Sequence, residues 1–420
     1  MPPADPRPDT RPARRAAAFP SSFLSHVIAM STTNTLDLVG SVTLPTALPL
    51  ASPALEAAVT ELSERLFRSF PRAGHRLKGE QYLRGLLTAP GRKTVRNIAR
   101  ALGDPGAAQR LHHFVCNAPW HWQPVREALA AHLSASAPPQ AWVVRSLVIP
   151  KSGNRSAGVH RRFEPETGQV VNGQQAHGLW YARPGTNTPV DWCLNPPPRT
   201  LPGSRPRPVD LGPGRRPVTA LLDRAGGTGE VAPAPVLWDC PAEDAADARR
   251  TLVALPVPGA VRLLGTTALD VLGPSGRPAL HSPLPAERIA TLPGAPWRCG
   301  HEVVAGVRAV TVRVAPPRPR AASPARRAHG RPEDGLLLYA QWRADHPGRA
   351  DFWLTSLART PAAELHRLTG LADQVARDTA RTGARVGLRD FEGRSYDGWH
   401  RHMTLVSVAH AALLRAQGRW

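Results

Sequence analysis

Basic side chains gather in one segment whose spacing suits the recognition of nucleic acid. Lys93, Arg96 and Arg100 lie in RKTVRNIARALGD, where apolar residues follow a helical spacing and form one stripe that leaves these cations elsewhere on the helix surface. GDPG then supplies a tight stop, and AAQRLHHFVC predicts a second helix. Such a pair is typical of a helix-turn-helix, whose second helix enters a major groove. A basic helical hairpin with a solvated face fits the pattern equally well.

A second basic group follows an apolar run that itself contains a cation. AWVVRSLVIPKSG, residues 141–153, predicts a buried strand with Arg145 in its middle. A buried guanidinium needs a carboxylate partner. Lys151 and Arg155 fall in the turn that follows, where they either track a DNA backbone or line a solvated basic hairpin.

The composition narrows the class of protein. The 420 residues include 53 basic and 32 acidic side chains, and the net charge of +21 favours a polyanionic partner. No apolar run reaches the roughly 18 residues that span a bilayer, so no membrane is expected. The four cysteines show no paired spacing, which favours reduced thiols in a cytoplasmic protein. Met1 and Met30 are both candidate start residues.

Changes in residue composition and periodicity along the chain predict three parts. Residues 1–55 are rich in Pro, Ser, Thr and Ala, and we expect a flexible arm there. Residues 56–138 predict a helical, DNA-binding domain. Residues 139–420 carry strand-like runs followed by helical ones, which predicts an α/β layer arrangement. Two loose inserts, near 195–217 and 315–334, are rich in Pro and Arg.

Several motifs in order resemble one family. VGLRDFEGRSYDGWHRHMTLVSVAHA, residues 386–411, resembles the C-terminal signature of insertion-sequence transposases with a DDE endonuclease domain. QYLRGLL, RKTVRNIARALGD, PKSGNRSAGVHRRF, GQVVNGQQA, LLLYAQW and DFWLTSL match in the same order, so the resemblance covers most of residues 57–415. It implies a ribonuclease-H-like mixed sheet with a strand-rich insertion, preceded by a helical N-terminal domain. It also implies double-stranded DNA at transposon ends as the partner, and leaves a homodimer open.

The same resemblance implies metal-dependent chemistry. In the family, three carboxylates hold two Mg²⁺ or Mn²⁺ ions, which activate the attacking oxygen and steady the leaving one. The first acid falls on Arg145 and its acidic neighbour on Ser146. A guanidinium about 4 Å from a divalent ion would be repelled by roughly 8 kcal/mol at an effective dielectric near 20. The second acid falls on Asp223 in VTALLDRAGG, a predicted catalytic residue and metal ligand and the expected partner of Arg145. An ordinary strand-end aspartate that caps a turn is the alternative.

The third acid belongs to a family pattern of tyrosine, arginine, glutamate and lysine along one helix. Counted back from the Gly-Leu block, the four positions hold none of these residues; they are Thr369, Ala372, Ala376 and Gly383. Asp373 precedes the glutamate position by one turn, but the helix would have to shift to bring it into the site. We therefore expect Asp373 and Asp378 to be solvated surface residues.

Two of the three acids are thus replaced, at Arg145 and Ala376, while the flanking motifs persist. Arg394, His400 and His402, in and beside GWHRH, either contact DNA or pack and hydrogen-bond the start of a helix. The sequence predicts a DDE-type transposase homologue that is catalytically inactive. A non-catalytic DNA-binding protein derived from a transposase is the alternative, and a vestigial product is the third possibility.

Overall fold

A computed structural model describes residues 52–164, 169–195, 233–242, 245–255, 257–292, 298–304, 307–317, 335–342 and 348–420. The predicted arm and the two predicted inserts lie mostly outside these residues, and so does Asp223. The last residues of the predicted arm are helical, because α2 (Pro53–Leu66) begins at Pro53. Ser52 caps this helix by accepting the Leu55 N–H, and proline is well placed in a first turn.

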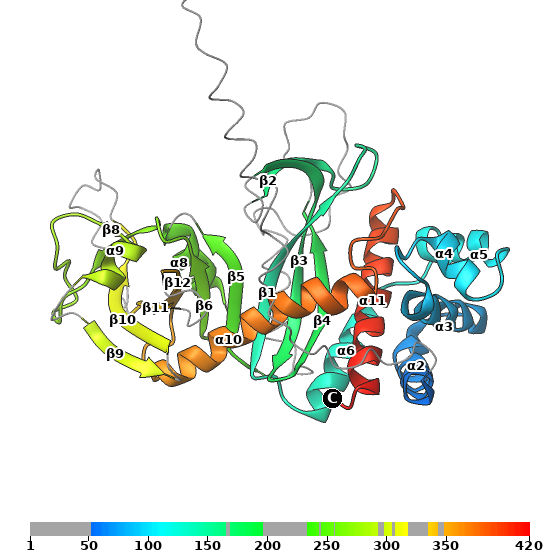
Figure 1. Cartoon of the computed structure of the whole chain (residues 1–420), viewed down its shortest axis with the longest axis horizontal. Coiled ribbons are helices and arrows are strands. Elements are labelled where there is room, and N and C mark those ends of the chain that lie inside the picture. Colours follow the sequence, from blue (N-terminus) through cyan, green and yellow to red (C-terminus); the bar gives the residue numbers. More distant parts are fainter. Residues whose placement is uncertain are drawn as a thin grey trace, which may run out of the picture. The chain divides into compact units, whose positions relative to one another are not determined.

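The N-terminal part is helical, as the sequence predicts (Figure 1). Its elements are α2, the short η1 (Phe67–Ser69), α3 (Ala73–Thr88), α4 (Val95–Ala101), α5 (Ala107–Cys116) and α6 (Gln123–Ser136). The pair of helices expected in the basic segment is present as α4 and α5. Gly103 lies in the turn between them with φ +74°, a left-handed conformation that favours glycine. α3, α4 and α5 pack against one another, so this turn belongs to a compact three-helix unit.

A mixed sheet built around β1 (Ala141–Pro150) follows these helices. β1 pairs antiparallel with β3 (Gln169–Arg183) on one side and parallel with β5 (Val236–Ala242) on the other. β3 also pairs with β2 (His160–Glu164) and β4 (Thr186–Leu194), and β5 pairs in parallel with β6 (Gly259–Leu263). The order β4-β3-β1-β5-β6 agrees with the predicted ribonuclease-H-like sheet.

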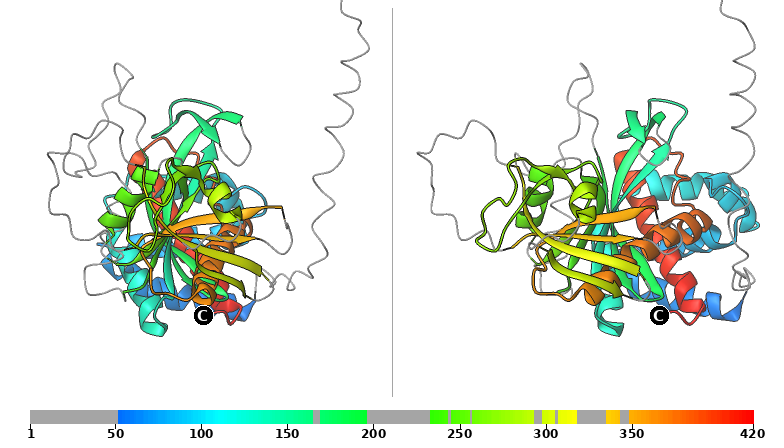
Figure 2. Two further views of the ribbon diagram at one scale, coloured as in Figure 1. Left: turned by 90° about the vertical axis from the view of Figure 1, so that its left-hand side faces the viewer. Right: turned by 60° about the vertical axis from the view of Figure 1, so that its left-hand side comes forward.

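Beyond β6 the sheet continues into the predicted strand-rich insertion (Figure 2). β6 pairs antiparallel with β12 (Ala350–Thr355), and the chain of pairings runs on through β11 and β10. The remaining elements of this part are α8 (Ala245–Ala254), β7 (Ala268–Val271), β8 (Leu284–Pro285), α9 (Ala286–Thr291), β9 (Arg298–Val304), β10 (Val307–Ala315) and β11 (Leu337–Trp342).

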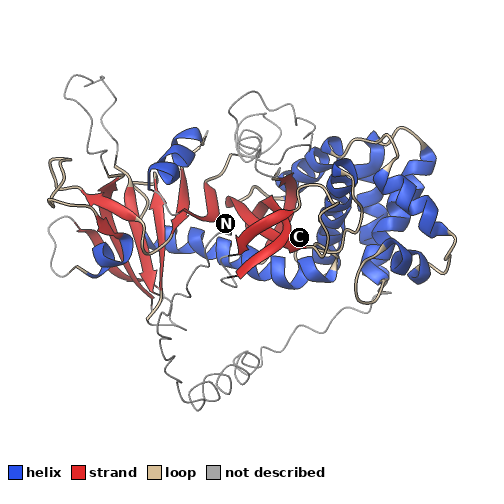
Figure 3. Cartoon of the chain, turned by 90° about the horizontal axis from the view of Figure 1, so that it is seen from above, coloured by secondary structure: helices blue, strands red, loops and turns tan. Residues whose placement is uncertain are grey.

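Two long helices complete the fold, and they cover different parts of it (Figures 1 and 3). α10 (Ala362–Asp378) packs against β1, β3, β5 and strands of the insertion, and it runs on into a π-helical segment, η2 (Thr379–Gly383). α11 (Tyr396–Ala416) packs against α2, α3, α5, α6 and β4, and every residue from 398 to 414 is buried. The N-terminal helices and the sheet therefore share α11, and the described residues form one compact unit.

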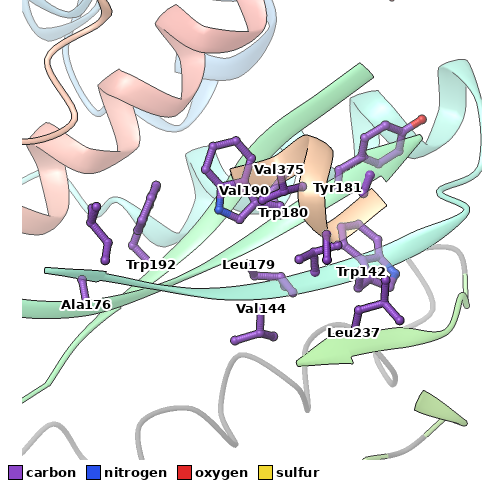
Figure 4. Packing of buried hydrophobic residues seen from close by; sticks show 14 of the residues in the cluster. Trp142, Val144, Ala176, Leu179, Trp180, Tyr181, Val190, Trp192, Leu237 and Val375 are labelled. Carbon is purple, nitrogen blue, oxygen red and sulfur yellow. The ribbon is translucent and has the colours of Figure 1, made fainter. Parts of the chain in front are cut away.

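Aromatic side chains fill the space between the sheet and the helices (Figure 4). Trp142 of β1 lies edge-on to Tyr181 of β3, with ring centroids 6.0 Å apart. Trp180 of β3 meets Trp192 of β4 in the same way at 6.2 Å. Ala141 to Val144 are all fully buried, so both faces of β1 are covered in this part of the strand, which explains its apolar sequence. No helix among the described residues is long and apolar enough to span a membrane.

Candidate functional site

Arg145 is positioned by the parallel pairing of β1 with β5. The register places it beside Asp239, and its Nη1 donates to Asp239 Oδ2. The Asp239 side chain is 2% exposed and that of Arg145 is 19% exposed. A guanidinium in a covered strand therefore has the carboxylate partner that its burial requires. The partner described here is Asp239, a residue that the sequence analysis did not single out, and the predicted partner Asp223 lies outside the described residues.

A second arginine joins the same aspartate to two more acids. Arg262, on β6, donates from Nε to Asp239 Oδ1 at 2.5 Å, from Nη1 to Asp351 Oδ1 of β12 at 2.8 Å, and from Nη2 to Asp373 Oδ1 of α10 at 3.1 Å. Its guanidinium also stacks on Trp353, 4.5 Å from the ring centroid. These contacts define the arginine–aspartate cluster, which consists of Arg145, Asp239, Arg262, Asp351 and Asp373.

In the cluster, the attraction between opposite charges opposes the effect of burial on the pKa values of Asp239 and Arg262. Burial raises the pKa of Asp239, and the guanidinium groups of Arg262 and Arg145 oppose that rise. Burial lowers the pKa of Arg262, but Asp239, Asp351 and Asp373 outweigh it, so the pKa of Arg262 ends above its ordinary value. Arg262 is therefore charged at neutral pH, and the cluster is held by charge-assisted hydrogen bonds.

These residues do not fit a pair of divalent metal ions. Both carboxylate oxygens of Asp239 are engaged by guanidinium groups, and Ala376 offers no ligand atom. Within the described ranges, no group of three or more His, Cys, Asp or Glu side chains is arranged to hold a metal. A divalent ion here would also meet the repulsion of two nearby arginines.

The expectation of solvated acids on α10 is wrong for both residues. Asp373 reaches Arg262 of β6 without any shift of the helix, and β12 pairs with β6 at this point. Asp378 accepts a hydrogen bond from Asn187 Nδ2 at 2.8 Å, and burial raises its pKa. Both acids thus connect α10 to strands of the sheet.

Sequence reasoning missed Asp239, Arg262 and Asp351. A signal for Asp239 was present, because PVLWDC is a short apolar run that ends in an acid and precedes the predicted helix AEDAADARRTLVAL. In a parallel βαβ unit that pattern places the aspartate beside the neighbouring strand. For Arg262 and Asp351 there was no such local signal, since their meeting depends on the pairing of β6 with β12.

Four of the predicted DNA-binding residues are buried or engaged inside the protein. Lys93 is 6% exposed and its Nζ donates to the Ala89 carbonyl, and burial lowers its pKa. Lys151 is half-buried and donates from Nζ to the Phe391 carbonyl at 2.5 Å. His400 and His402 are 3% and 0% exposed. We therefore withdraw Lys93, His400 and His402 as phosphate contacts, because side chains buried this deeply cannot reach DNA.

The C-terminal signature instead fixes α11 against the N-terminal helices. His402 donates from Nε2 to the Gly387 carbonyl at 3.0 Å, so its Nδ1 is the acceptor for Tyr82 Oη at 2.9 Å. Gly387 has φ +83°, and a Cβ there would lie 2.6 Å or less from side-chain carbons of Lys93. Arg401 donates to backbone carbonyls at and beyond the end of α5. The packing interpretation of GWHRH is confirmed for its two histidines.

The other predicted basic residues are exposed and come together from separate segments. Arg96, Arg100, Arg155 and Arg394 are exposed, and the Ala157 N–H donates to the Arg394 carbonyl at 3.2 Å, which joins the loop after β1 to the loop before α11. The loop before α11 also reaches the segment that precedes α4, through ion pairs of Arg92 with Asp390 and Glu392 at 3.8 and 3.7 Å. A cleft of about 570 Å³ separates it from α4 and α5, and Arg96, Gln109 and His112 are among its lining residues.

The sequence profile of one family, described as DDE superfamily endonuclease, matches residues 65–278. The match includes Arg145, Asp239 and Arg262, and it ends before Asp351 and Asp373. A comparison with curated proteins gave no match. Because the profile covers half of its residues, and because the mixed sheet around β1 agrees with it, the chain belongs to the DDE superfamily endonucleases.

Proposed function

We propose that this protein is an insertion-sequence transposase homologue that binds transposon ends without cutting them. Membership of the family implies a DNA substrate and a transposase-like function, and the family generally uses divalent metal ions. The observation that carries the proposal is the ion pair of Arg145 with Asp239, at the strand position where the resemblance puts the first catalytic acid. Arg145 and Arg262 occupy the carboxylate oxygens of Asp239 that a metal ion would need, and this supports binding of DNA without cleavage.

The DNA-binding part of the proposal rests on α4 and α5. Their mutual packing with α3 and the left-handed Gly103 favour a helix-turn-helix over a simple basic hairpin. In that geometry α5 enters the major groove. Leu111, Phe114 and Val115 of α5 face the core, which leaves its exposed polar side chains to meet base edges; these are Gln109, Arg110, His112 and His113.

Exposed arginines beside α5 supply the phosphate contacts in this proposal. Arg96 and Arg100 lie on α4, and Arg155 and Arg394 lie on two loops joined by the Ala157 hydrogen bond. Contacts with phosphate fix the position of a protein on the duplex, whereas contacts with base edges give sequence preference. The two sets of residues should therefore be separable by mutation.

The binding test compares the two sets on DNA from the flanks of the gene. For Arg96→Ala and Arg155→Ala we expect weaker binding to every sequence and a salt slope smaller by about one per arginine. For Gln109→Ala we expect about 1–3 kcal/mol less discrimination between the preferred and a scrambled sequence, because a base contact is lost. Fluorescence anisotropy over a salt series measures both quantities.

The matched control is Arg277→Ala, which removes an exposed arginine from the insertion, distant in the chain from α5. We expect its binding curve and salt slope to match those of the natural protein. Binding that depends on charge alone, with no preference for any flanking sequence and with Arg277→Ala as damaging as Arg96→Ala, would refute recognition of transposon ends.

The cleavage test asks whether the protein cuts at all. We expect no Mg²⁺- or Mn²⁺-dependent nicking of a plasmid that carries the flanking DNA, because the positions of two acids hold Arg145 and Ala376. The DNA is analysed on denaturing gels after incubation with each ion, with an EDTA reaction as the blank. Cuts at defined ends by the natural protein would show that the acid site lies elsewhere and would overturn the inactive part of the proposal.

A further inference from the structure

Arg262 holds the central place in the arginine–aspartate cluster. Its three donor positions meet three different carboxylates, at 2.5, 2.8 and 3.1 Å. The acids come from β5, β12 and α10, so one side chain ties three elements of the chain to β6. Bringing three carboxylates to one point is unfavourable unless a cation lies between them.

The environment of Arg262 suits a guanidinium better than any other cationic side chain. Its side chain is 16% exposed, and its flat group stacks on Trp353 while its edge donates to the acids. Lysine carries a point charge without a planar set of donors, so it cannot reproduce this arrangement. Arg145 pairs with Asp239, and Asp351 and Asp373 each accept a hydrogen bond from Arg262.

We propose that Arg262 is a built-in cation that takes the charge-neutralising place of a divalent ion, which makes the cluster a metal-independent structural centre. Two arginines face three aspartates, so the cluster carries one net negative charge with Arg262 present and two without it. This inference concerns stability and does not depend on DNA binding. If acids were restored at positions 145 and 376, Arg262 would still be present as a cation in the cluster.

Thermal unfolding in EDTA and in millimolar Mn²⁺ tests the proposal, with Arg262→Gln as the main variant. For the natural protein we expect the same Tm in both buffers. For Arg262→Gln in EDTA we expect a Tm lower by roughly 5–10 °C, because Asp239, Asp351 and Asp373 each lose an ion pair. Mn²⁺ should restore part of this loss, and Asp351→Asn added to Arg262→Gln should remove the Mn²⁺ effect.

Two further variants complete the design. Arg313→Gln removes an exposed arginine of β10 and should leave the Tm and its lack of metal response unchanged. Arg262→Lys keeps a positive charge, so it should fold even if Arg262→Gln does not, with a Tm between those of the natural protein and the glutamine variant. A natural Tm that rises with Mn²⁺, or Arg262→Gln and Arg262→Lys proteins as stable as Arg313→Gln, would overturn the proposal and leave the DNA-binding proposal intact.

Discussion

Replacement of Asp191 by asparagine is expected to lower the free energy of unfolding by about 3–5 kcal/mol, the usual cost of leaving one buried charge without its partner. Arg126, on α6, donates from Nη1 to Asp191 Oδ1 of β4 at 2.7 Å, and the two side chains are 2% and 6% exposed. Arg126 also donates to Thr404 Oγ1 and to the His400 carbonyl of α11. The pair therefore joins a helix of the N-terminal part, the sheet and α11 at one point.

Urea unfolding followed by tryptophan fluorescence measures this effect. Glu364→Gln is the matched control, because it breaks the exposed pair with Arg367, and pairs of that kind contribute about 0–1 kcal/mol. Arg126→Met combined with Asp191→Leu should be more stable than Asp191→Asn alone, since no charge is left buried. An Asp191→Asn midpoint equal to that of Glu364→Gln would show that the buried pair is not needed.

A steep loss of stability below pH 6.5 is the second large effect that we expect. Burial lowers the pKa of His177 and of His402 to about 4, and that of His410 to about 3. Between those values and the ordinary 6.5, the unfolded chain binds protons that the folded chain does not, so the free energy of unfolding falls as the pH falls. In this window each histidine lowers the free energy of unfolding by about 1.4 kcal/mol for each pH unit of acidification, and the three together lower it by roughly 4 kcal/mol per pH unit.

The contribution of a single histidine to this pH dependence can be measured at His410. It is fully buried, its ring lies edge-on to Trp180 at 5.5 Å, and neither ring nitrogen has a hydrogen-bond partner among the described residues. His410→Leu should therefore reduce the dependence of the free energy of unfolding on pH between 6.5 and 5 by about 1.4 kcal/mol per pH unit. Ordinary carboxylates titrate mostly below this window, so they interfere little. An unchanged slope in His410→Leu would mean that burial does not lower the pKa of this ring in the folded state.

Local patterns predicted the helices and strands of the fold well, because helical and strand periodicities depend on residues that are close together in the sequence. The segment of α4 and α5, the strand that carries Arg145, and the helical C-terminal part all follow from such patterns. The resemblance then supplied the ribonuclease-H-like sheet, which the observed order of strands supports.

The site was less predictable, because it is made by pairings between distant segments. The sequence indicated that Arg145 needs a carboxylate, but the choice of Asp239 depends on the register of β1 with β5. The role of Arg262 depends on the pairing of β6 with β12 and on the position of α10. The sequence also left open whether His400 and His402 contact DNA or pack inside the protein, since a polar motif does not reveal that a helix is covered on every side.

The sharing of α11 also constrains how the protein folds. Tyr82 and His402 form a buried hydrogen bond across 320 residues of chain, and Arg415 reaches Glu61 across 354. Contacts between residues so distant in sequence slow the search for the native state. Because the ribosome synthesises α2 and α3 long before α11, the apolar surface of these helices that α11 covers stays exposed while the sheet is synthesised. We expect nascent chains of this protein to need protection from aggregation until α11 emerges.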